Sequence, residues 1–372
     1  MAGAKEREQM LARWAETGKP QYSPVAIKAL KDKSPEVRRA AAAALQKIYD
    51  ERALDPLLEA LKDKEASVRE QAALALGASN NTQAAQVLVQ VLKDKTVDVR
   101  RAAAAALRKL NWRPATAEER ALFSIAQGRA RDTWREGEAA VDALVSELGN
   151  ETVFFRRSAV AALEGIRDER SIDPLVAAMD DPDATVRVSA VHALGSIGGD
   201  RVIDELLNYI HDESHHVRLA VADTLRKMWR PDFLNYFVVL LSDKNLEVRC
   251  VAAESLGKSE DPNAVEPLIG ALKDEDPDVR RLAAQALGRL KDRRAIESLV
   301  GVLTDKESAV RHAAANALQI VDFAWRSSAA ALKAVPVLEA ALNDKEYWVR
   351  QSAAKALNHI RGSSDTMPPL SQ

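Results

Sequence analysis

Hydrophobic positions recur along this chain in blocks that predict pairs of helices. Leu54, Leu57, Leu58 and Leu61 are spaced three and four residues apart, which places them on one face of a first helix. A short polar turn follows, and then an alanine-rich run such as residues 102–107 predicts a second helix that can approach its neighbours closely. Two such helices cannot bury their apolar faces alone, so the pairs are expected to stack.

A fixed motif marks the start of each second helix: an acidic residue, four positions, Val, then Arg. Ten copies occur, and in the fourth copy Asn150 and Phe155 replace Asp and Val. Seven of the nine steps between successive arginines are 31 residues, and the others are 56 and 39. A fixed period of this size indicates a solenoid. The arginines are Arg38, Arg69, Arg100, Arg156, Arg187, Arg218, Arg249, Arg280, Arg311 and Arg350.

Helix boundaries can be read from residue type. Seven of the ten residues four positions before these arginines are Ser, Thr, Asp or Asn, which favour the N-cap. Pro56 and its counterparts near the start of other first helices either open the helix or kink it. Gly77, Gly257 and two counterparts end second helices, where glycine suits a C-terminal cap or tight packing.

The repeated Asp and Arg have a structural interpretation. The Asp lies in the turn between the helices, where its carboxylate can accept backbone N–H groups. The Arg can fork to a carboxylate of the adjacent repeat. A ladder of such pairs would fix the stacking angle, so we exclude these residues from every functional site.

The pattern of an acidic residue, four positions, Val-Arg and an alanine-rich run ending in Leu-Gly resembles HEAT repeats. It is similar to the short, 31-residue type also found in phycobilisome lyase subunits, and residues 51–76, 170–195 and 265–288 match best. The resemblance implies an all-α fold, a right-handed α-solenoid of about ten two-helix repeats. It also implies that the second helices line the concave face and that the surface binds proteins or peptides.

We expect three parts in the chain. Residues 1–22 are predicted to form an N-terminal capping helix, with Met10, Leu11 and Trp14 covering the first repeat. Residues 23–361 are predicted to form a single solenoid, with insertions at about 111–137 and 321–334, and residues 362–372 are predicted to form a disordered tail.

The first insertion contains a second kind of signal. Thr116 is placed to cap a short helix. The insertion is either a packing adapter that changes curvature or a lid over a ligand, and both interpretations stay open. The aromatic side chains expected to fill the space that it opens are Trp112, Phe123, Trp134, Phe154 and Phe155.

A second aromatic cluster lies further along the chain. It is either a buried stripe on a first helix or an exposed binding patch. Its members are Trp229, Phe233, Tyr236 and Phe237.

Composition narrows the function. The net charge is −2 and the isoelectric point is about 6.4, which argues against nucleic acid and membrane surfaces as partners. No stretch of 18 apolar residues occurs, and the start of the chain lacks the apolar core of a signal peptide. A single cysteine fits a reducing compartment. We expect a cytoplasmic protein.

Candidate chemistry is sparse. His211, His215 and His216 lie close in sequence, but their spacing matches no standard metal site, and a solvated turn is the simpler interpretation. Cys250 follows an Arg at a helix start, where a thiol can be activated or can stay inert. We therefore expect no catalytic residue, no cofactor and no metal.

The concave face carries the most information. Positions one, five, eight and nine after each motif Arg hold twelve basic and four acidic residues. The face is either an ordinary solvated surface or a groove for an acidic partner. The expected partner-binding residues are Arg39, Arg101, Arg108, Lys109, Arg157, His192, Arg226, Lys227, Cys250, Lys258, Arg281, Arg289 and His312.

These observations favour a non-enzymatic scaffold or adaptor that binds a protein or peptide on the concave face, and an acidic partner is one of the two open interpretations of that face. The alternative is a phycobilin-lyase-like factor that attaches a tetrapyrrole. A membrane or a nucleic acid is not an expected partner.

Overall fold

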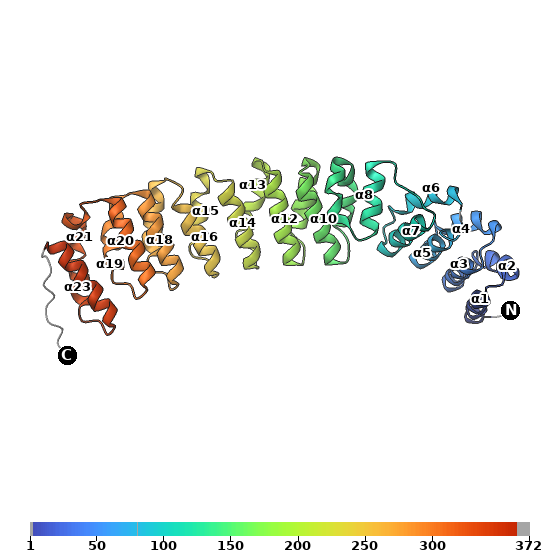
Figure 1. Cartoon of the computed structure of the whole chain (residues 1–372), viewed down its shortest axis with the longest axis horizontal. Helices are drawn as coiled ribbons and strands as arrows, with labels where there is room; N and C mark the ends of the chain where they lie inside the picture. The colour runs from blue at the N-terminus through green and yellow to red at the C-terminus, as the bar shows by residue number, and fades with distance from the viewer. Residues whose placement is uncertain (1–2, 80, 363–372) are drawn as a thin grey trace. The chain divides into compact units, whose positions relative to one another are not determined.

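The computed structural model describes residues 3–79 and 81–362 and divides into two compact units, residues 1–197 and 198–372. The described part of each unit contains helices and no strand, and the helices follow one another in stacked pairs (Figure 1). The predicted all-α solenoid architecture is confirmed. That residues 23–361 form a single solenoid stays a prediction, and residues 363–372 of the predicted tail lie outside the described residues.

Unit 1 contains five helix pairs, an additional helix at its start and an insertion. The first helices are α2 (Ser23–Ala29), α4 (Leu54–Ala60), α6 (Thr82–Val91), α9 (Val141–Glu147) and α11 (Ile172–Ala178). The second helices, together with the initial α1, are α1 (Ala4–Thr17), α3 (Pro35–Lys47), α5 (Ala66–Leu76), α7 (Val97–Lys109), α10 (Val153–Ile166) and α12 (Ala184–Ile197). The insertion forms α8 (Ala117–Ala126) and the 3₁₀ segment η3 (Ala130–Ala140).

Unit 2 repeats the arrangement. Its first helices are α13 (Asp200–Leu207), α15 (Leu234–Leu240), α17 (Val265–Ala271), α19 (Ile296–Val302) and α22 (Val335–Ala341). Its second helices are α14 (His215–Lys227), α16 (Leu246–Leu256), α18 (Pro277–Leu290), α20 (Ser308–Val321) and α23 (Tyr347–Arg361). The second insertion forms η8 (Trp325–Ser327) and α21 (Ala329–Lys333). Short 3₁₀ turns precede other first helices: η1 (Pro20–Tyr22), η2 (Glu51–Ala53), η4 (Glu169–Ser171), η5 (Pro231–Phe233), η6 (Pro262–Ala264) and η7 (Arg293–Ala295).

The local signals act as their chemistry predicts at some N-caps, whereas Thr96, Thr152 and Ser214 make no side-chain cap hydrogen bond. Ser34, Asn245 and Asp276 each occupy an N-cap and accept a backbone N–H through the side chain. Pro56 lies in the first turn of α4, where backbone N–H groups have no intrahelical partner, so it opens the helix without interrupting a hydrogen bond. Of the two interpretations of these prolines, the structure therefore favours helix initiation.

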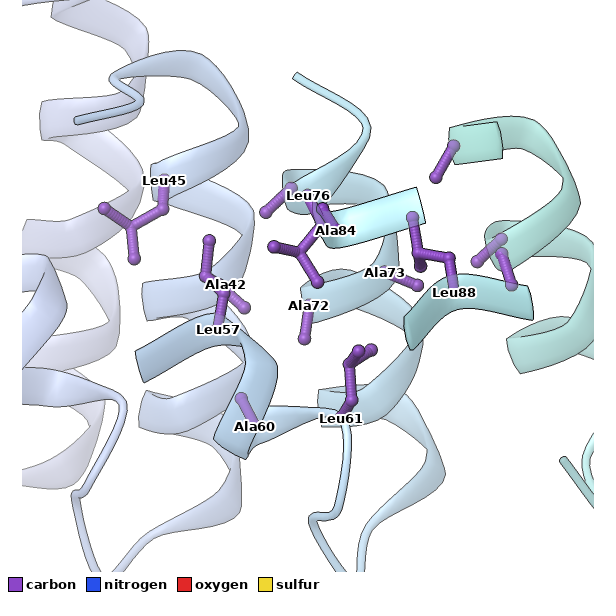
Figure 2. Close-up of a cluster of buried hydrophobic side chains, with 14 of the residues drawn as sticks. Ala42, Leu45, Leu57, Ala60, Leu61, Ala72, Ala73, Leu76, Ala84 and Leu88 are labelled. Atoms are coloured by element: carbon purple, nitrogen blue, oxygen red, sulfur yellow. The ribbon is translucent and has the colours of Figure 1, made fainter. Parts of the chain in front are cut away.

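Alanine and leucine form the core of each unit. In unit 1 the first-helix Leu57 and Leu88 are fully buried, and so are Ala42 and Ala72 of the second helices α3 and α5. Figure 2 shows these side chains gathered in one cluster between the helices. Because alanine adds little width, the second helices lie close to one another and the leucines of the first helices close the core from the other side.

Glycine permits the closest approach between second helices. A Cβ on Gly77 of unit 1 would lie 2.8 Å from the Cα of Ala106, and one on Gly257 of unit 2 would lie 2.7 Å from the Cα of Ala286. Both glycines have ordinary helical backbone angles. Tight packing, and not a left-handed C-cap, explains the glycine at these positions.

Gly257→Ala is therefore expected to lower the free energy of unfolding by about 1–3 kcal/mol, because the added methyl group has no space. Gly270→Ala is the matched control, since a Cβ there meets nothing within 4 Å. On helix α17 this change is expected to stabilise the protein by about 0.5–1 kcal/mol. Urea unfolding followed by circular dichroism measures both, and equal effects would contradict the packing explanation.

The repeated arginines form the predicted ladder. In unit 1 the Arg38 guanidinium forks to Asp63, with Nε 2.6 Å from Oδ2 and Nη2 2.9 Å from Oδ1. Its Nη1 donates to the carbonyl oxygens of Asp32 and Lys33 at 3.0 and 3.2 Å. One side chain thus joins the turn of its own repeat to the turn of the next. The same fork occurs in Arg69–Asp94 and Arg156–Asp181 of unit 1, and in Arg218–Asp243, Arg249–Asp274 and Arg280–Asp305 of unit 2.

The ladder carboxylates also accept hydrogen bonds from backbone N–H groups. The Oδ1 of Asp63 also accepts the backbone N–H of Glu65 at 3.0 Å, which closes the turn before α5. The Arg38 guanidinium, which donates to it, holds the pKa of Asp63 below its usual value. Burial acts to raise the pKa of Asp94, yet the Arg69 guanidinium leaves that pKa below its usual value as well. The ladder residues are structural, as the sequence predicts.

The ladder begins one repeat earlier than the motif indicates. Arg7 of α1 pairs with Asp32 at 3.0 Å and lies 31 residues before Arg38. Helix α1 therefore occupies the place of a second helix and packs against α3. Leu11 is buried and Trp14 stacks on Tyr22 with ring centroids 5.0 Å apart, whereas Met10, which was expected to cover the repeat, is 41% exposed.

The first insertion interrupts the ladder, and a neighbouring carboxylate restores the ion pair but not the fork, because the buried Arg100 Nε has no hydrogen-bond partner among the described residues. Asn150 occupies the ladder Asp position and still accepts the backbone N–H of Thr152 at 2.9 Å, so it retains the turn function. The charge that it lacks comes from Glu147 of α9, whose Oε1 accepts from Arg100 and whose Oε2 accepts from the Asn150 amide at 3.0 Å. Glu147 is 3% exposed and was not identified from the sequence.

Removal of one ladder cation is expected to leave a buried carboxylate unpaired. Arg218→Ala should lower the free energy of unfolding by about 3 kcal/mol, because Arg218 and Asp243 have side chains only 12% and 8% exposed. Arg350→Ala is the matched control. Arg350 makes the same two carbonyl contacts through Nη1, at 2.8 Å each, but has no carboxylate partner among the described residues. The Arg350→Ala substitution should lower the free energy of unfolding by about 1 kcal/mol or less. An unchanged urea midpoint for Arg218→Ala would contradict a stabilising role of the ladder.

Candidate functional site

The exposed side chains of the second helices form one surface on each unit, which we call the second-helix face. On unit 1 its predicted partner-binding residues lie on four helices. Five of them are exposed and His192 of α12 is half-buried. The exposed residues are Arg39, Arg101, Arg108, Lys109 and Arg157.

Acidic neighbours reduce the charge of this face. On unit 1, Arg39 pairs with Glu8 at 2.8 Å and Arg101 lies 3.6 Å from Asp98. These acids lie outside the four positions used for the sequence count, which therefore overstates the basic excess. Arg108, Lys109 and Arg157 have no carboxylate within ion-pair distance in the described part of the chain, so among the predicted partner-binding residues of this face they carry the uncompensated charge.

The first insertion concentrates this charge at an open cleft. Arg101 and Arg108 of α7 line one side, and Arg129, which follows α8, lines the other. The cleft has a volume of about 410 Å³, and its lining contains three arginines and no carboxylate. Arg101 also lies over the Phe155 ring, 4.9 Å from its centroid, and the Arg129 guanidinium donates to the Gln127 amide oxygen. The sequence analysis did not single out Arg129, which follows Gly128 in the turn after α8.

The aromatic residues of the insertion divide into two groups. Phe155 is buried, and Trp112 packs edge-on against Phe123 with centroids 5.6 Å apart, so these three fill space as expected. Trp134 and Phe154 do not, because they are 49% and 61% exposed. The expectation that all five plug a cavity is wrong for these two.

The local backbone explains why Trp134 is exposed. It lies on η3 between α8 and α10, where the irregular segment substitutes for a regular second helix. A Cβ on Gly165 of α10 would lie 3.0 Å from the Trp134 Cβ, so the tryptophan rests against a glycine and cannot sink further into the core. Arg131 and Trp134 line a second open cleft, whose lining also includes the acidic Asp132 and Glu164.

The second-helix face of unit 2 is closer to neutral. Arg226 pairs with Asp223 at 2.8 Å, Lys258 with Glu254 at 2.7 Å and Arg281 with Asp278 at 2.9 Å. These pairs join residues three or four positions apart on one helix, where exposed ion pairs contribute little to stability. Lys227 and Arg289 remain without a carboxylate within ion-pair distance among the described residues, and His312 is exposed.

Cys250 is a poor nucleophile. Burial, together with the nearby Asp278 and Asp276, raises the pKa of its thiol to about 11. Arg249, the neighbour that could have stabilised a thiolate, is already forked to Asp274. The structure therefore favours the inert interpretation of this cysteine.

The remaining candidates have packing roles or no assembled site. Phe233 and Phe237 are fully buried and Trp229 stacks on Phe237 with centroids 5.5 Å apart, so the second aromatic cluster is a buried stripe. The His215 and His216 rings lie 3.9 Å apart. Over residues 3–79 and 81–362, no three His, Cys, Asp or Glu side chains gather in a way that could hold a metal ion. None of the helices in the described part of the chain has the length and apolar character needed to cross a membrane.

Stacked helix pairs, a 31-residue period and a turn-to-turn ladder define an α-solenoid repeat protein. The chain belongs to the HEAT-repeat family. A family model described as HEAT repeats matches residues 6–76, 23–109, 55–145, 109–194, 141–226, 203–274 and 234–319. A second family model, described as HEAT repeat, matches residues 334–360.

Two solved structures are similar to this chain. One is an engineered protein from a structural genomics consortium, with 22% identity, a TM-score of 0.39, and coverage of 91% of this chain and 98% of the other. The second is the Escherichia coli protein YibA, with 20% identity, a TM-score of 0.41, and coverage of 78% and 98%. No curated protein matches the chain.

Proposed function

We propose that this chain is a non-enzymatic scaffold that binds an acidic protein or peptide segment on its second-helix faces. A HEAT-repeat solenoid fits a role in protein interaction in general. The observation that carries the finer proposal is the arginine-lined cleft of unit 1 with the exposed Trp134 beside it. Arginine and tryptophan are enriched among the residues that contribute most to protein interfaces.

The charge distribution supports an acidic partner. The three arginines of the cleft come from α7 and from the turn after α8, and its lining offers them no carboxylate. An acidic segment would supply the missing counter-charges, and the exposed tryptophan would bury apolar area against it. In this proposal the insertion combines both of its interpretations. It is a packing adapter that bridges α7 to α10, and it supplies residues that contact the ligand. No described residue specifically favours tetrapyrrole attachment.

The test uses a fluorescein-labelled (Glu-Asp)₅ peptide and stopped-flow anisotropy. Reversing Arg101, Arg108 and Lys109 to Glu should slow association about tenfold or more at low salt, because electrostatic attraction steers the encounter. The difference should shrink at high salt, since screening acts over about 8 Å at physiological ionic strength. Helicity should be unchanged, because all three side chains are exposed.

The matched control reverses Lys33, Lys64 and Lys95 to Glu. These exposed lysines lie in the inter-helix turns of unit 1, and the net charge changes by the same amount. The control should retain the wild-type association rate within about twofold. Equal slowing in both variants, or rates that do not respond to salt, would contradict a specific acidic-segment site on the second-helix face.

A further inference from the structure

The second insertion breaks the ladder inside unit 2 and leaves it open. The motif Asp of the last repeat, Asp344, follows Arg311 by 33 residues, whereas every continuous rung spans 25. Among the described residues no carboxylate lies within ion-pair distance of Arg311. Asp344 accepts the backbone N–H of Glu346 at 2.8 Å, so it retains its turn function without its arginine. No neighbouring acid takes over here, in contrast to Glu147 in unit 1.

Arg311 is nevertheless oriented like the other ladder arginines. Its Nη1 donates to the carbonyl oxygens of Asp305 and Lys306 at 2.7 and 2.9 Å, the two contacts that hold Arg280 on Asp274 and Glu275. In Arg280 these contacts aim Nε and Nη2 at a carboxylate of the next repeat. The fork of Arg311 is therefore pre-oriented toward the place where that carboxylate is missing.

A cleft of about 300 Å³ occupies that place. The segment η8 contacts both α20 and α23, and the buried Trp325 forms part of the lining. With the Gln319 amide turned so that its oxygen faces them, the indole Nε1 and the Arg326 guanidinium donate to that oxygen at 3.3 and 3.0 Å. Asp322 fixes the start of the insertion through Arg293 at 3.0 Å. The insertion is thus anchored on the side of α20, and the cleft is built into the fold.

The lining of the cleft is cationic. Besides Arg311 it includes Arg326 and Lys355, two histidines and no acidic residue. His312 Nδ1 lies 2.7 Å from the Ser308 carbonyl oxygen, which fixes the orientation of the ring. Burial and the charges of Arg326 and Lys355 lower the pKa of His359, as expected where positive charge is uncompensated.

We propose that the cleft between α20, η8 and α23 binds a carboxylate of a peptide partner, which occupies the vacant ladder position on Arg311. The planar guanidinium fork matches a carboxylate in two parallel hydrogen bonds, as it does in the other rungs. Lys355 and Arg326 add positive charge around it. This site is separate from the arginine-lined cleft of unit 1.

The probe is an acetylated, amidated peptide that copies residues 303–308, Leu-Thr-Asp-Lys-Glu-Ser, because its Asp is a carboxylate that this lattice already binds. The imidazole NMR resonances of His312 and His359 are followed during titration. Saturable shifts of both are expected with the full chain. A peptide with Asn in place of the Asp should bind at least tenfold more weakly.

Variants of the fork decide whether Arg311 is responsible. Arg311→Ala should weaken binding at least tenfold, and Arg311→Lys should restore only part of it, because lysine lacks the fork. Arg350→Ala is the control, since it removes an open fork outside the cleft, and it should leave affinity within twofold. Arg311 forms no ion pair with a described carboxylate, so its variants should fold, and Lys355→Gln at the same cleft should also weaken binding.

Three results would overturn the proposal: no saturable shift, wild-type affinity in Arg311→Ala, or inorganic phosphate binding more tightly than the peptide. Both reporter histidines lie in unit 2, so this outcome is independent of the acidic-segment site in unit 1. If the triple reversal in unit 1 fails to slow association of the acidic peptide, the shifts of His312 and His359 are still expected. If those shifts are absent, the effect of the triple reversal is still expected.

Discussion

The bidentate contact between an arginine and the aspartate of the next repeat is the constraint on which the structure depends. A 31-residue repeat has too few aromatic residues to lock its neighbours by shape, and its alanine-rich helices could slide past one another. The fork prevents this sliding, because a single guanidinium saturates two carbonyl oxygens of one turn and a carboxylate of the next. Within each unit, the conformation of one turn and its contact with the next turn are therefore set by the same atoms.

The two insertions show what happens when this constraint is disturbed. In unit 1, 25 additional residues separate Arg100 from the next motif position, Asn150. Glu147 accepts a hydrogen bond from Arg100 in its place, and Asn150 still closes the turn. In unit 2, eight additional residues separate Arg311 from Asp344, and no described carboxylate replaces the lost partner. Both places carry clefts rich in cationic side chains. Cationic clefts thus lie where the lattice is interrupted.

The regular part of the fold could be predicted from the sequence because identical residues recur in identical surroundings. Helix pairs, N-caps and the ladder follow from the period alone. The features that the sequence did not predict each occur once, in surroundings that no other repeat shares. Arg7 lacks the preceding Val, although its 31-residue distance from Arg38 identifies it. Trp134 resembles a core residue in sequence, and only the path of η3 exposes it. Two of the acids that lower the charge of the second-helix faces, Asp98 and Asp278, lie at positions that a one-face count omits.

A double-mutant cycle on Arg280 and Asp305 of unit 2 tests the central claim most directly. The side chains are 8% and 11% exposed and their fork distances are 2.7 and 3.0 Å. Urea unfolding of the wild type, Arg280→Ala, Asp305→Ala and the double variant gives the coupling free energy, free of each residue's separate contacts. The account predicts a coupling of about 1.5 kcal/mol or more. A coupling free energy below about 0.5 kcal/mol would mean that the Arg–Asp pairs do not determine how the repeats stack.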